Sequence, residues 1–396
     1  MLSAWLLPEH IADVLPAEAA RIESLRRTLL DRARRCGFEL VMPPMLEHLE
    51  ALLSGTGRGL DLETFKLIDQ MSGRTLGLRG DTTPQAARID AHLLNHEGVT
   101  RLCYCGPVLH TRPRGLRASR EPLQFGAEIF GHAGLEADLE AQELAVQALR
   151  SAGIRNPTLD LADARLLQGV LAGVPLDAMQ LHEVAQALSE KDAAGLRGLT
   201  VAAPAVAQQA LQSLTDLYGG RDVLQRAASA LPDRPLVRRA LEDLSWLANH
   251  LERIDPTLEV SFDLSDMSGY AYYSGPRFAL YADGWSDALA RGGRYDEVGS
   301  VFGRNRPAVG FSLDLKTLAE ASPSEPPACA AILAPWSEDG PLRAEVRRLR
   351  DAGEVVVFAL PGQAAHEQAQ ACDRELVPDG EGWGVRARQA LNVTKE

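Results

Sequence analysis

The stretch LQFGAEIFG, residues 123–131, carries the clearest local signal in the chain. Its side chains alternate in polarity, which predicts a β-strand, because successive residues of a strand point to opposite faces. One face would carry the apolar side chains of Leu123, Phe125, Ala127 and Ile129. The other would carry Gln124, Gly126 and Glu128, and the alternation leaves two alternatives open for it. This face is either half solvated or covered, in which case it is the floor of a pocket.

The residues just before this strand predict a second strand and a polar loop. Residues 101–109 are largely apolar, and four of the nine positions in the following loop, 112–120, are arginine. These are Arg112, Arg114, Arg117 and Arg120. Guanidinium groups bind phosphates and carboxylates, so this arginine loop is a candidate contact for an anion or a partner protein. A solvated loop in an arginine-rich protein is the alternative.

Other elements follow along the rest of the chain. Apolar residues at three- and four-residue spacing predict a helix over 22–36, with Pro16 near its start and Gly37 just past its end. Residues 164–254 are rich in Ala, Leu and Gln and predict a block of helices. Three prolines within 322–327 mark a linker, and the residues beyond it predict a β-α-β unit.

Composition places the chain among ordinary globular proteins. It has 396 residues, 45% of them apolar and 24% charged, a length that suggests two or three domains. Its 41 basic and 54 acidic residues give a formal net charge of -13. This balance argues against a protein whose main task is to bind nucleic acid. Because no apolar run approaches the roughly 18 residues that span a bilayer, no membrane partner is expected.

The cysteines argue against a disulfide framework or a zinc ribbon. Of the five, only Cys103 and Cys105 are close together, and no second pair has the spacing of a zinc site. Scattered thiols fit a reducing compartment. We therefore expect a cytoplasmic protein without a bound metal or cofactor.

A cluster of tyrosines stands out in a chain with 5% aromatic residues. Tyr270, Tyr272 and Tyr273 occupy three of four successive positions. Packing alone rarely prefers tyrosine, because each buried hydroxyl group needs a hydrogen-bond partner. A ligand pocket that uses these hydroxyls explains the cluster better than packing does.

Several of these segments resemble, in order along residues 10–320, the motifs of histidyl-tRNA synthetase. They are GFELVMPP at 37–44, LRGDTT at 78–83, the region 101–131, SGYAYY at 268–273, GGRYD at 292–296 and PAVGF at 307–311. The resemblance implies an α+β fold of the class II aminoacyl-tRNA synthetase type, with an antiparallel sheet flanked by helices. It also implies a body over 1–163 and 255–321, a helical insertion over 164–254 and a small C-terminal α/β domain over 328–396. Residues 37–44 would build a homodimer.

The chain departs from the synthetase pattern at the positions that act on ATP. The first arginine of the second motif is replaced by His110, and the glutamate that follows it has no clear counterpart. The third motif, Gly-Leu-Glu-Arg in the family, reads Asp314-Leu315-Lys316-Thr317, and Ser268 replaces another arginine. Losing one well-placed donor to a developing charge costs about 3–4 kcal/mol. Lys316 is a poor substitute for a planar bidentate clamp, so no catalysis is expected.

The residues of the amino-acid pocket, by contrast, match the synthetase pattern. The residues that would bind histidine are Asp81, Thr83, Gln124, Glu128, Tyr272 and Tyr273, with Gly126 leaving room for the ligand's ring. Carboxylates suit an ammonium group and an imidazole N–H. A synthetase-like body with this pocket and no ATP clamp resembles the regulatory subunits of ATP phosphoribosyltransferase.

That family resemblance implies a non-catalytic role in the first step of histidine biosynthesis and in its feedback regulation by histidine. The expected partners are a short-form ATP phosphoribosyltransferase catalytic subunit, a second copy of the chain and L-histidine, with no nucleic acid. Two alternatives remain open. One is a histidyl-tRNA synthetase with atypical motifs, against which the motif losses and the acidic balance stand. The other is a free-standing histidine sensor.

Overall fold

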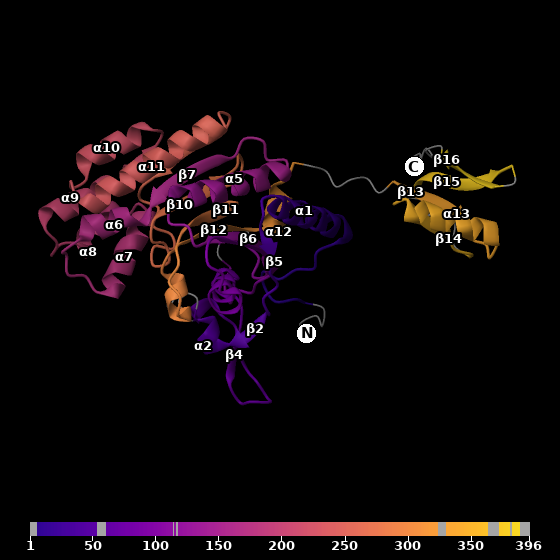
Figure 1. Ribbon diagram of the computed structural model, residues 1–396, viewed down its shortest axis with the longest axis horizontal. Coiled ribbons are helices and arrows are strands. Elements are labelled where there is room, and N and C mark those ends of the chain that lie inside the picture. The colour runs from indigo at the N-terminus through magenta and orange to yellow at the C-terminus, as the bar shows by residue number, and fades with distance from the viewer. Residues whose placement is uncertain are drawn as a thin grey trace. The chain divides into compact units, whose positions relative to one another are not determined.

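The computed structural model describes residues 6–53, 61–113, 115, 118–323, 330–362, 372–380 and 382–388. The chain divides into two compact units, Met1–Ser324 and Glu325–Glu396 (Figure 1). The linker predicted over 322–327 falls at this division, and residues 324–327 lie outside the described part of the chain. Across the described residues, the helices are too short or too polar to cross a bilayer.

A nine-stranded sheet runs through the described part of the larger unit. Its order is β1-β5-β6-β12-β11-β10-β7-β9-β8. The bounds are β1 Glu39–Leu40, β5 Thr100–Pro107, β6 Leu123–Phe130, β12 Ala308–Asp314, β11 Ala290–Arg294, β10 Pro276–Tyr281, β7 Thr158–Asp163, β9 Glu259–Asp263 and β8 Tyr218–Gly219. The strands from β5 to β7 pair antiparallel, and the pairs β1–β5 and β7–β9 are parallel. The predicted strand at 123–131 is thus β6, near one end of this sheet.

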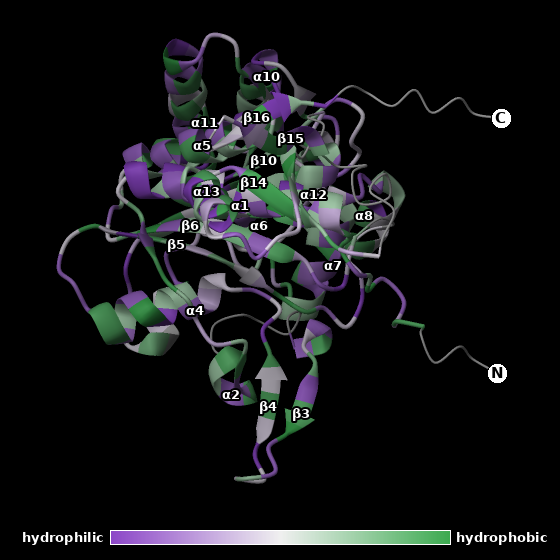
Figure 2. Cartoon of the chain, turned by 90° about the vertical axis from the view of Figure 1, so that its right-hand side faces the viewer, coloured by the Kyte–Doolittle hydropathy of each residue, from purple (hydrophilic) through white to green (hydrophobic). Residues whose placement is uncertain are grey.

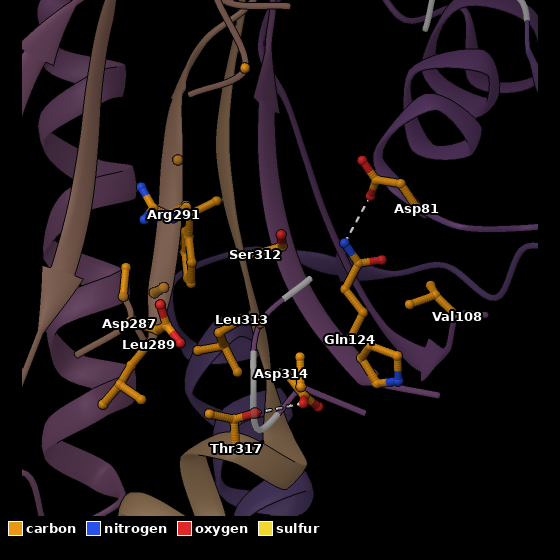
Figure 3. A pocket seen from close by; sticks show the side chains of 18 of the residues that line it. Asp81, Val108, Gln124, Asp287, Leu289, Arg291, Ser312, Leu313, Asp314 and Thr317 are labelled. Atoms are coloured by element: carbon orange, nitrogen blue, oxygen red, sulfur yellow. Dashed lines mark hydrogen bonds between the residues drawn. The ribbon is translucent and has the colours of Figure 1, made fainter. Parts of the chain in front are cut away.

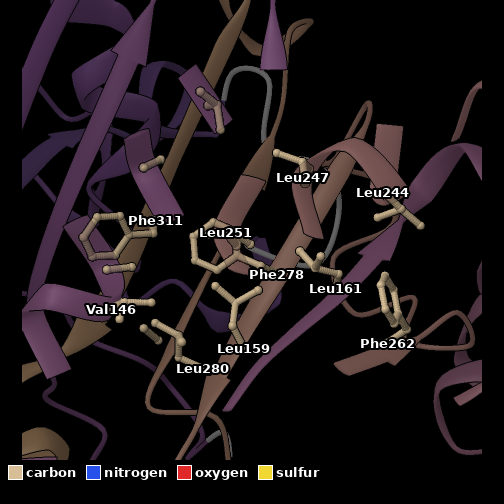
Figure 4. Close-up of a cluster of buried hydrophobic side chains, with 14 of the residues drawn as sticks. Val146, Leu159, Leu161, Leu244, Leu247, Leu251, Phe262, Phe278, Leu280 and Phe311 are labelled. Carbon is tan, nitrogen blue, oxygen red and sulfur yellow. The ribbon is translucent and has the colours of Figure 1, made fainter. Parts of the chain in front are cut away.

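Three helices cover the apolar face of β6 and its neighbour β5. They are α1 (Pro16–Arg35), α5 (Leu135–Ser151) and α12 (Leu315–Ala321). Phe125, Ala127 and Ile129 are each 1% exposed and belong to the same core cluster as Leu29 of α1. This agrees with the alternation in the sequence, and Figure 4 shows Leu159 of β7 and Phe278 of β10, which belong to the same core cluster further across the sheet.

The opposite face of β6 is covered as well, so its half-solvated alternative is wrong. Glu128 is 1% exposed and Gln124 is 9% exposed. The cover comes from α4 (Thr83–Arg88), which contacts β6, and from tyrosine side chains described below. A second buried cluster that includes Tyr104 and Tyr295 lies on this side.

The region 164–254 is mostly helical, and its apolar side chains continue the main core cluster. It contains α6 Ala164–Leu171, α7 Ala178–Ser189, α8 Ala193–Leu199, α9 Ala205–Leu214, α10 Asp222–Ala230 and α11 Pro235–Ile254. The short strand β8 interrupts these helices and pairs with β9. Leu244 and Leu247 of α11 and Phe262 of β9 belong to one cluster (Figure 4). The domain boundaries at 163/164 and 254/255 stay a proposal.

A small three-stranded sheet, which the sequence did not predict, precedes the pocket loop. It consists of β2 (Leu46–His48), β4 (Thr75–Leu78) and β3 (Lys66–Ile68), with helix α2 (Leu49–Leu52) beside it (Figure 2). The end of β4 leads directly to residues 79–83. A π-helix at Ile89–Leu94 continues from α4, and a 3-10 helix at Val298–Phe302 contacts both of them.

The smaller unit has its own core around a sheet of order β14-β13-β15-β16 in its described residues. The predicted β-α-β unit is formed by β13 (Ala331–Pro335), α13 (Gly340–Asp351) and β14 (Val355–Ala359), whose strands are parallel. The strands β15 (Cys372–Asp379) and β16 (Gly382–Ala387) complete the sheet and were not predicted.

The close approach of β6 and β12 generates a prediction at Gly310. A Cβ atom there would lie 1.7 Å from Oε2 of Glu128 and 2.5 Å from the backbone oxygen of Ala127. Gly310→Ala should therefore lower the free energy of unfolding by about 1–3 kcal/mol, as overpacking of a core does. Urea unfolding would measure this change.

Gly198→Ala in α8 is the matched control, because a Cβ atom at this position would meet nothing within 4 Å. It should be neutral or stabilise the helix by about 0.5–1 kcal/mol. Equal stability of the two variants would contradict the steric argument.

Candidate functional site

A pocket of about 980 Å³ opens on the polar face of β6, β12 and β11 (Figure 3). All six residues that the resemblance assigned to histidine binding line it: Asp81, Thr83, Gln124, Glu128, Tyr272 and Tyr273. They come from three separate parts of the chain, namely the start of α4 with the loop before it, the strand β6 and the loop before β10. The fold therefore brings the six predicted side chains to one place.

Gln124 and Asp81 are fixed against each other by hydrogen bonds. The Gln124 amide donates from Nε2 to Oδ1 of Asp81 at 2.8 Å, and its oxygen accepts from the backbone N–H of Thr82 at 2.9 Å (Figure 3). The backbone N–H of Thr83 also donates to Oδ1 of Asp81, at 3.1 Å. These bonds set the orientation of the Gln124 amide and of the Asp81 carboxylate at the pocket wall.

The carboxyl group of Glu128 lies between two tyrosine hydroxyls. Tyr104 donates to Oε1 at 2.9 Å, and Tyr295 donates to Oε2 at 2.5 Å. The Tyr104 hydroxyl is also 2.8 Å from Oγ1 of Thr83, so the network reaches the Asp81 loop. Burial raises the pKa of Glu128 to about 8, although the two tyrosine hydrogen bonds act to lower it.

Sequence reasoning missed both tyrosine partners. Tyr104 lies on the predicted strand 101–109, and Tyr295 lies within the GGRYD segment, but neither received a role. The signal was the buried Glu128 itself, since an acidic side chain inside a protein needs hydrogen-bond donors nearby. Which donors serve it depends on strand pairing, and local alternation does not give that pairing.

The role expected for Gly126 is wrong. Gly126 pairs directly with Tyr104 across the β5–β6 ladder, and a Cβ atom at 126 would lie 2.3 Å from the Tyr104 hydroxyl oxygen. The glycine therefore makes room for the ring of Tyr104, which is itself 1% exposed. No space is left above Gly126 for the ring of a ligand.

The tyrosine cluster supplies a further wall of the pocket. The ring of Tyr272 stacks on that of Tyr295, with centroids 4.9 Å apart, and meets Tyr273 edge-on at 5.5 Å. The hydroxyl group of Tyr272 is buried and has no hydrogen-bond partner among the described residues. A buried hydroxyl without a partner is costly, so a ligand that reached this group would remove the cost.

The three residues that the resemblance sets at arginine positions of the synthetase pattern, His110, Ser268 and Thr317, are hydrogen-bonded within the chain. Nε2 of His110 lies 2.8 Å from the carbonyl oxygen of Gly80. The Ser268 hydroxyl donates to Asp266 at 2.6 Å. The Thr317 hydroxyl donates to Asp314 at 2.8 Å (Figure 3), and Asp314 also accepts the backbone N–H of Leu123.

Negative charge dominates the described lining of the pocket. The acidic side chains in it are those of Asp81, Asp287, Asp314 and Glu320, together with Glu128, whose raised pKa of about 8 keeps it largely protonated at neutral pH. The basic side chains in the same lining are those of Arg291 and His110. Lys316 lies 3.5 Å from Glu121 and does not line the pocket. Like charges repel, so the lining favours a ligand with a cationic group over a polyphosphate.

The arginine loop is only partly described. Arg112 is exposed, and Arg120 donates to the backbone oxygens of His110 and Glu9 at 3.1 and 3.3 Å. Arg114 and Arg117 lie outside the described residues. Neither Arg112 nor Arg120 lines the pocket. Within the described ranges, no group of three His, Cys, Asp or Glu side chains is placed to hold a metal ion.

Family models match both units of the chain. The model described as histidyl-tRNA synthetase matches residues 10–318. The model described as the C-terminal domain of the ATP phosphoribosyltransferase subunit HisZ matches residues 329–386. The first match supports the predicted class II synthetase-like body.

Relatives named ATP phosphoribosyltransferase regulatory subunit match along almost their whole length. The protein from Variovorax paradoxus (strain S110) is 59% identical over 387 residues, which cover 98% of this chain and 100% of that one. The protein from Albidiferax ferrireducens is 58% identical and covers 97% and 99%. These identities are well above the level at which two chains share a fold and a family.

Solved structures confirm the predicted fold class. A protein from Bacillus halodurans, described as an ATP phosphoribosyltransferase regulatory subunit/histidyl-tRNA synthetase, aligns with a TM-score of 0.82 and 26% identity, covering 94% of this chain and 97% of that one. A histidyl-tRNA synthetase from Nostoc aligns with a TM-score of 0.75 and 19% identity, covering 94% and 91%. The second likeness concerns the fold alone.

The raised pKa of Glu128 predicts a pH-dependent stability. In the unfolded chain its pKa is near 4.5, and burial raises it to about 8 in the folded chain. Folding therefore favours the protonated carboxyl, and this stabilisation is complete below pH 4.5 and is lost as the pH rises toward 8. Glu128→Gln has no proton to lose. Its free energy of unfolding relative to wild type should rise by up to about 1.4 kcal/mol per pH unit across this window.

Urea unfolding at several pH values would measure the difference. Glu183→Gln is the control, because Glu183 is exposed on α7 and should leave the pH dependence of wild type unchanged. A difference between Glu128→Gln and wild type that stays constant from pH 5 to 8 would show that the folded carboxyl keeps its ordinary pKa.

Proposed function

The chain belongs to the family of ATP phosphoribosyltransferase regulatory subunits, and on that premise we propose that it binds L-histidine in the pocket and acts on a catalytic ATP phosphoribosyltransferase subunit. Its role is regulatory and lies in histidine biosynthesis. It makes no bond-forming contribution of its own and takes part in feedback by histidine. One observation carries the proposal: the convergence of two carboxyl groups and an unpartnered hydroxyl in one pocket.

The groups of histidine match those of the pocket. Asp81, oriented by Gln124, is a suitable acceptor for the ligand's ammonium group. Glu128 and the Tyr272 hydroxyl, on the tyrosine wall, are suitable partners for the two imidazole nitrogens. The ring of Tyr272 or Tyr273 offers an aromatic surface for the imidazole to pack against.

The absence of synthetase chemistry is supported by how the former arginine positions are used. His110, Ser268 and Thr317 each hydrogen-bond within the chain, and none carries a fixed cation. The acidic lining would repel the phosphates of ATP. A pocket of this kind keeps amino-acid recognition and lacks the stabilisation that adenylation needs.

Assembly is proposed at two levels. The segment 37–44 would join two copies of the chain, and its exposed apolar side chains, Leu40 at 45% and Met42 at 80%, fit a protein interface. The dimer would then bind short-form catalytic subunits. Histidine would act through a coupling free energy of about 1–3 kcal/mol between the pocket and the catalytic site. The arginine loop, with Arg112 exposed, would contact the partner or an anion.

Histidine should stabilise the chain against unfolding. One site saturated at 100 times its Kd adds about 2.7 kcal/mol, which a thermal shift assay would detect. Glu128→Ala should abolish the shift, and Glu183→Ala, an exposed position on α7, should preserve it. The absence of any shift with millimolar histidine, with or without the catalytic subunit, would contradict a histidine pocket.

Co-expression with a short-form ATP phosphoribosyltransferase should give one complex on size-exclusion chromatography. The same preparation should show no histidine-dependent exchange between ATP and pyrophosphate, because the clamp positions carry no arginine. Robust exchange would instead support a histidyl-tRNA synthetase. Separate elution together with histidine binding would support a free-standing sensor.

A further inference from the structure

The proposed ligand brings a carboxylate into a pocket whose ionisable lining residues are mostly acidic. Besides Glu128, which is largely protonated at neutral pH, four carboxyl groups face this space, and without a cation they would repel the negative end of an amino acid. The arginines that the synthetase pattern places there are replaced by His110 and Ser268. A binding site for histidine therefore needs a cationic residue that pairs with the carboxylate of the ligand.

We propose that Arg291 binds the carboxylate of the amino-acid ligand, a proposal that rests on the function proposed above. Arg291 lies on β11, in the pocket lining. It is the one arginine in the described lining, and neither the sequence nor the resemblance gave it a role. A guanidinium group forms two parallel hydrogen bonds to a carboxylate.

The strand register places Arg291 on the correct face of the sheet. Arg291 pairs with Ser312 of β12, and Ser312 pairs with Gly126 of β6. Directly paired residues point to the same side, so Arg291 shares the face of Gln124 and Glu128. It lies two strands from Gly126, roughly 10 Å away at the usual spacing between strands. Figure 3 shows Arg291 across from Gln124 and Asp81, with Ser312 between them.

The internal contacts of Arg291 leave much of its side chain accessible, although it also interacts with the hydroxyl group of Tyr281 on β10. Its guanidinium lies 3.4 Å from Asp266, and its side chain is 42% exposed. Asp266 already has a closer partner in Arg277, at 2.9 Å, whose side chain is 2% exposed. The carboxylate of Asp266 would therefore stay paired if Arg291 turned toward the pocket.

The other basic groups near the pocket are committed elsewhere. His110 is 4% exposed and lies 2.8 Å from the carbonyl oxygen of Gly80. Arg294 bonds to Asp138 and to the carbonyl oxygen of Gly134. Arg79 donates to the carbonyl oxygens of Pro43 and Pro107, both at 2.8 Å. Within the described residues, Arg291 is the guanidinium that lines the pocket and shares its carboxylate partner with another arginine.

The test compares two ligands that differ in the carboxylate. Histamine is histidine without this group, and calorimetric titration of the full-length chain gives the Kd of each. Arg291→Gln should raise the Kd of histidine about ten-fold or more, which is the range for a hydrogen bond to a charged group. The Kd of histamine should stay the same or fall, because the variant pocket is more negative. Arg291→Lys keeps the charge without the planar fork and should weaken histidine less.

Arg253→Gln is the matched control. Arg253 is exposed on α11 and does not line the pocket, and its loss changes the net charge equally. An equal loss of affinity for both ligands in Arg291→Gln, or no loss for histidine, would overturn the role of Arg291 and leave the histidine pocket standing. If wild type binds neither ligand, the histidine pocket itself is wrong and the role of Arg291 falls with it.

Discussion

The carboxyl group of Glu128, held between the hydroxyls of Tyr104 and Tyr295, is the interaction on which the pocket depends. It joins β5, β6 and the end of β11 from inside the molecule. This arrangement requires glycine at two positions. Gly126 leaves room for the ring of Tyr104, and Gly310 leaves room for the carboxyl group of Glu128. Burial and hydrogen bonding together thus hold the polar side chains of β6 in place, and neither alone would determine their positions.

The two ends of the pocket have different chemical characters. Near Asp81 and Gln124, hydrogen bonds orient polar groups toward the cavity, and the Tyr272 hydroxyl has no partner among the described residues. Near Asp314 and Thr317, polar groups bond to each other and to the backbone of Leu123. Polar groups that lack a hydrogen-bond partner can recognise a ligand, whereas polar groups that bond to one another stabilise the fold.

Local patterns predicted the elements whose signals are local. The alternation at 123–131 gave the strand, its apolar face and the polar triad opposite, and the spacing at 22–36 gave the helix. The six pocket residues came from resemblance, because they lie far apart in the sequence. The sequence predicted no role for Tyr104, Tyr295 or Arg291, because their roles depend on how the strands pair. The sheet β2-β4-β3 was not predicted, because its strands have three or four residues and are too short to show an alternation of apolar and polar side chains.

The neutral state of Glu128 bears on the electrostatics of the whole chain. The formal net charge of -13 counts every carboxyl group as ionised. With a pKa of about 8, Glu128 carries a proton at neutral pH when the pocket is empty, so the folded chain is one unit less negative than the formula states. A cation that binds in the pocket and ionises this group releases a proton to solvent. The measured enthalpy of binding then depends on the buffer, because the buffer takes up this proton.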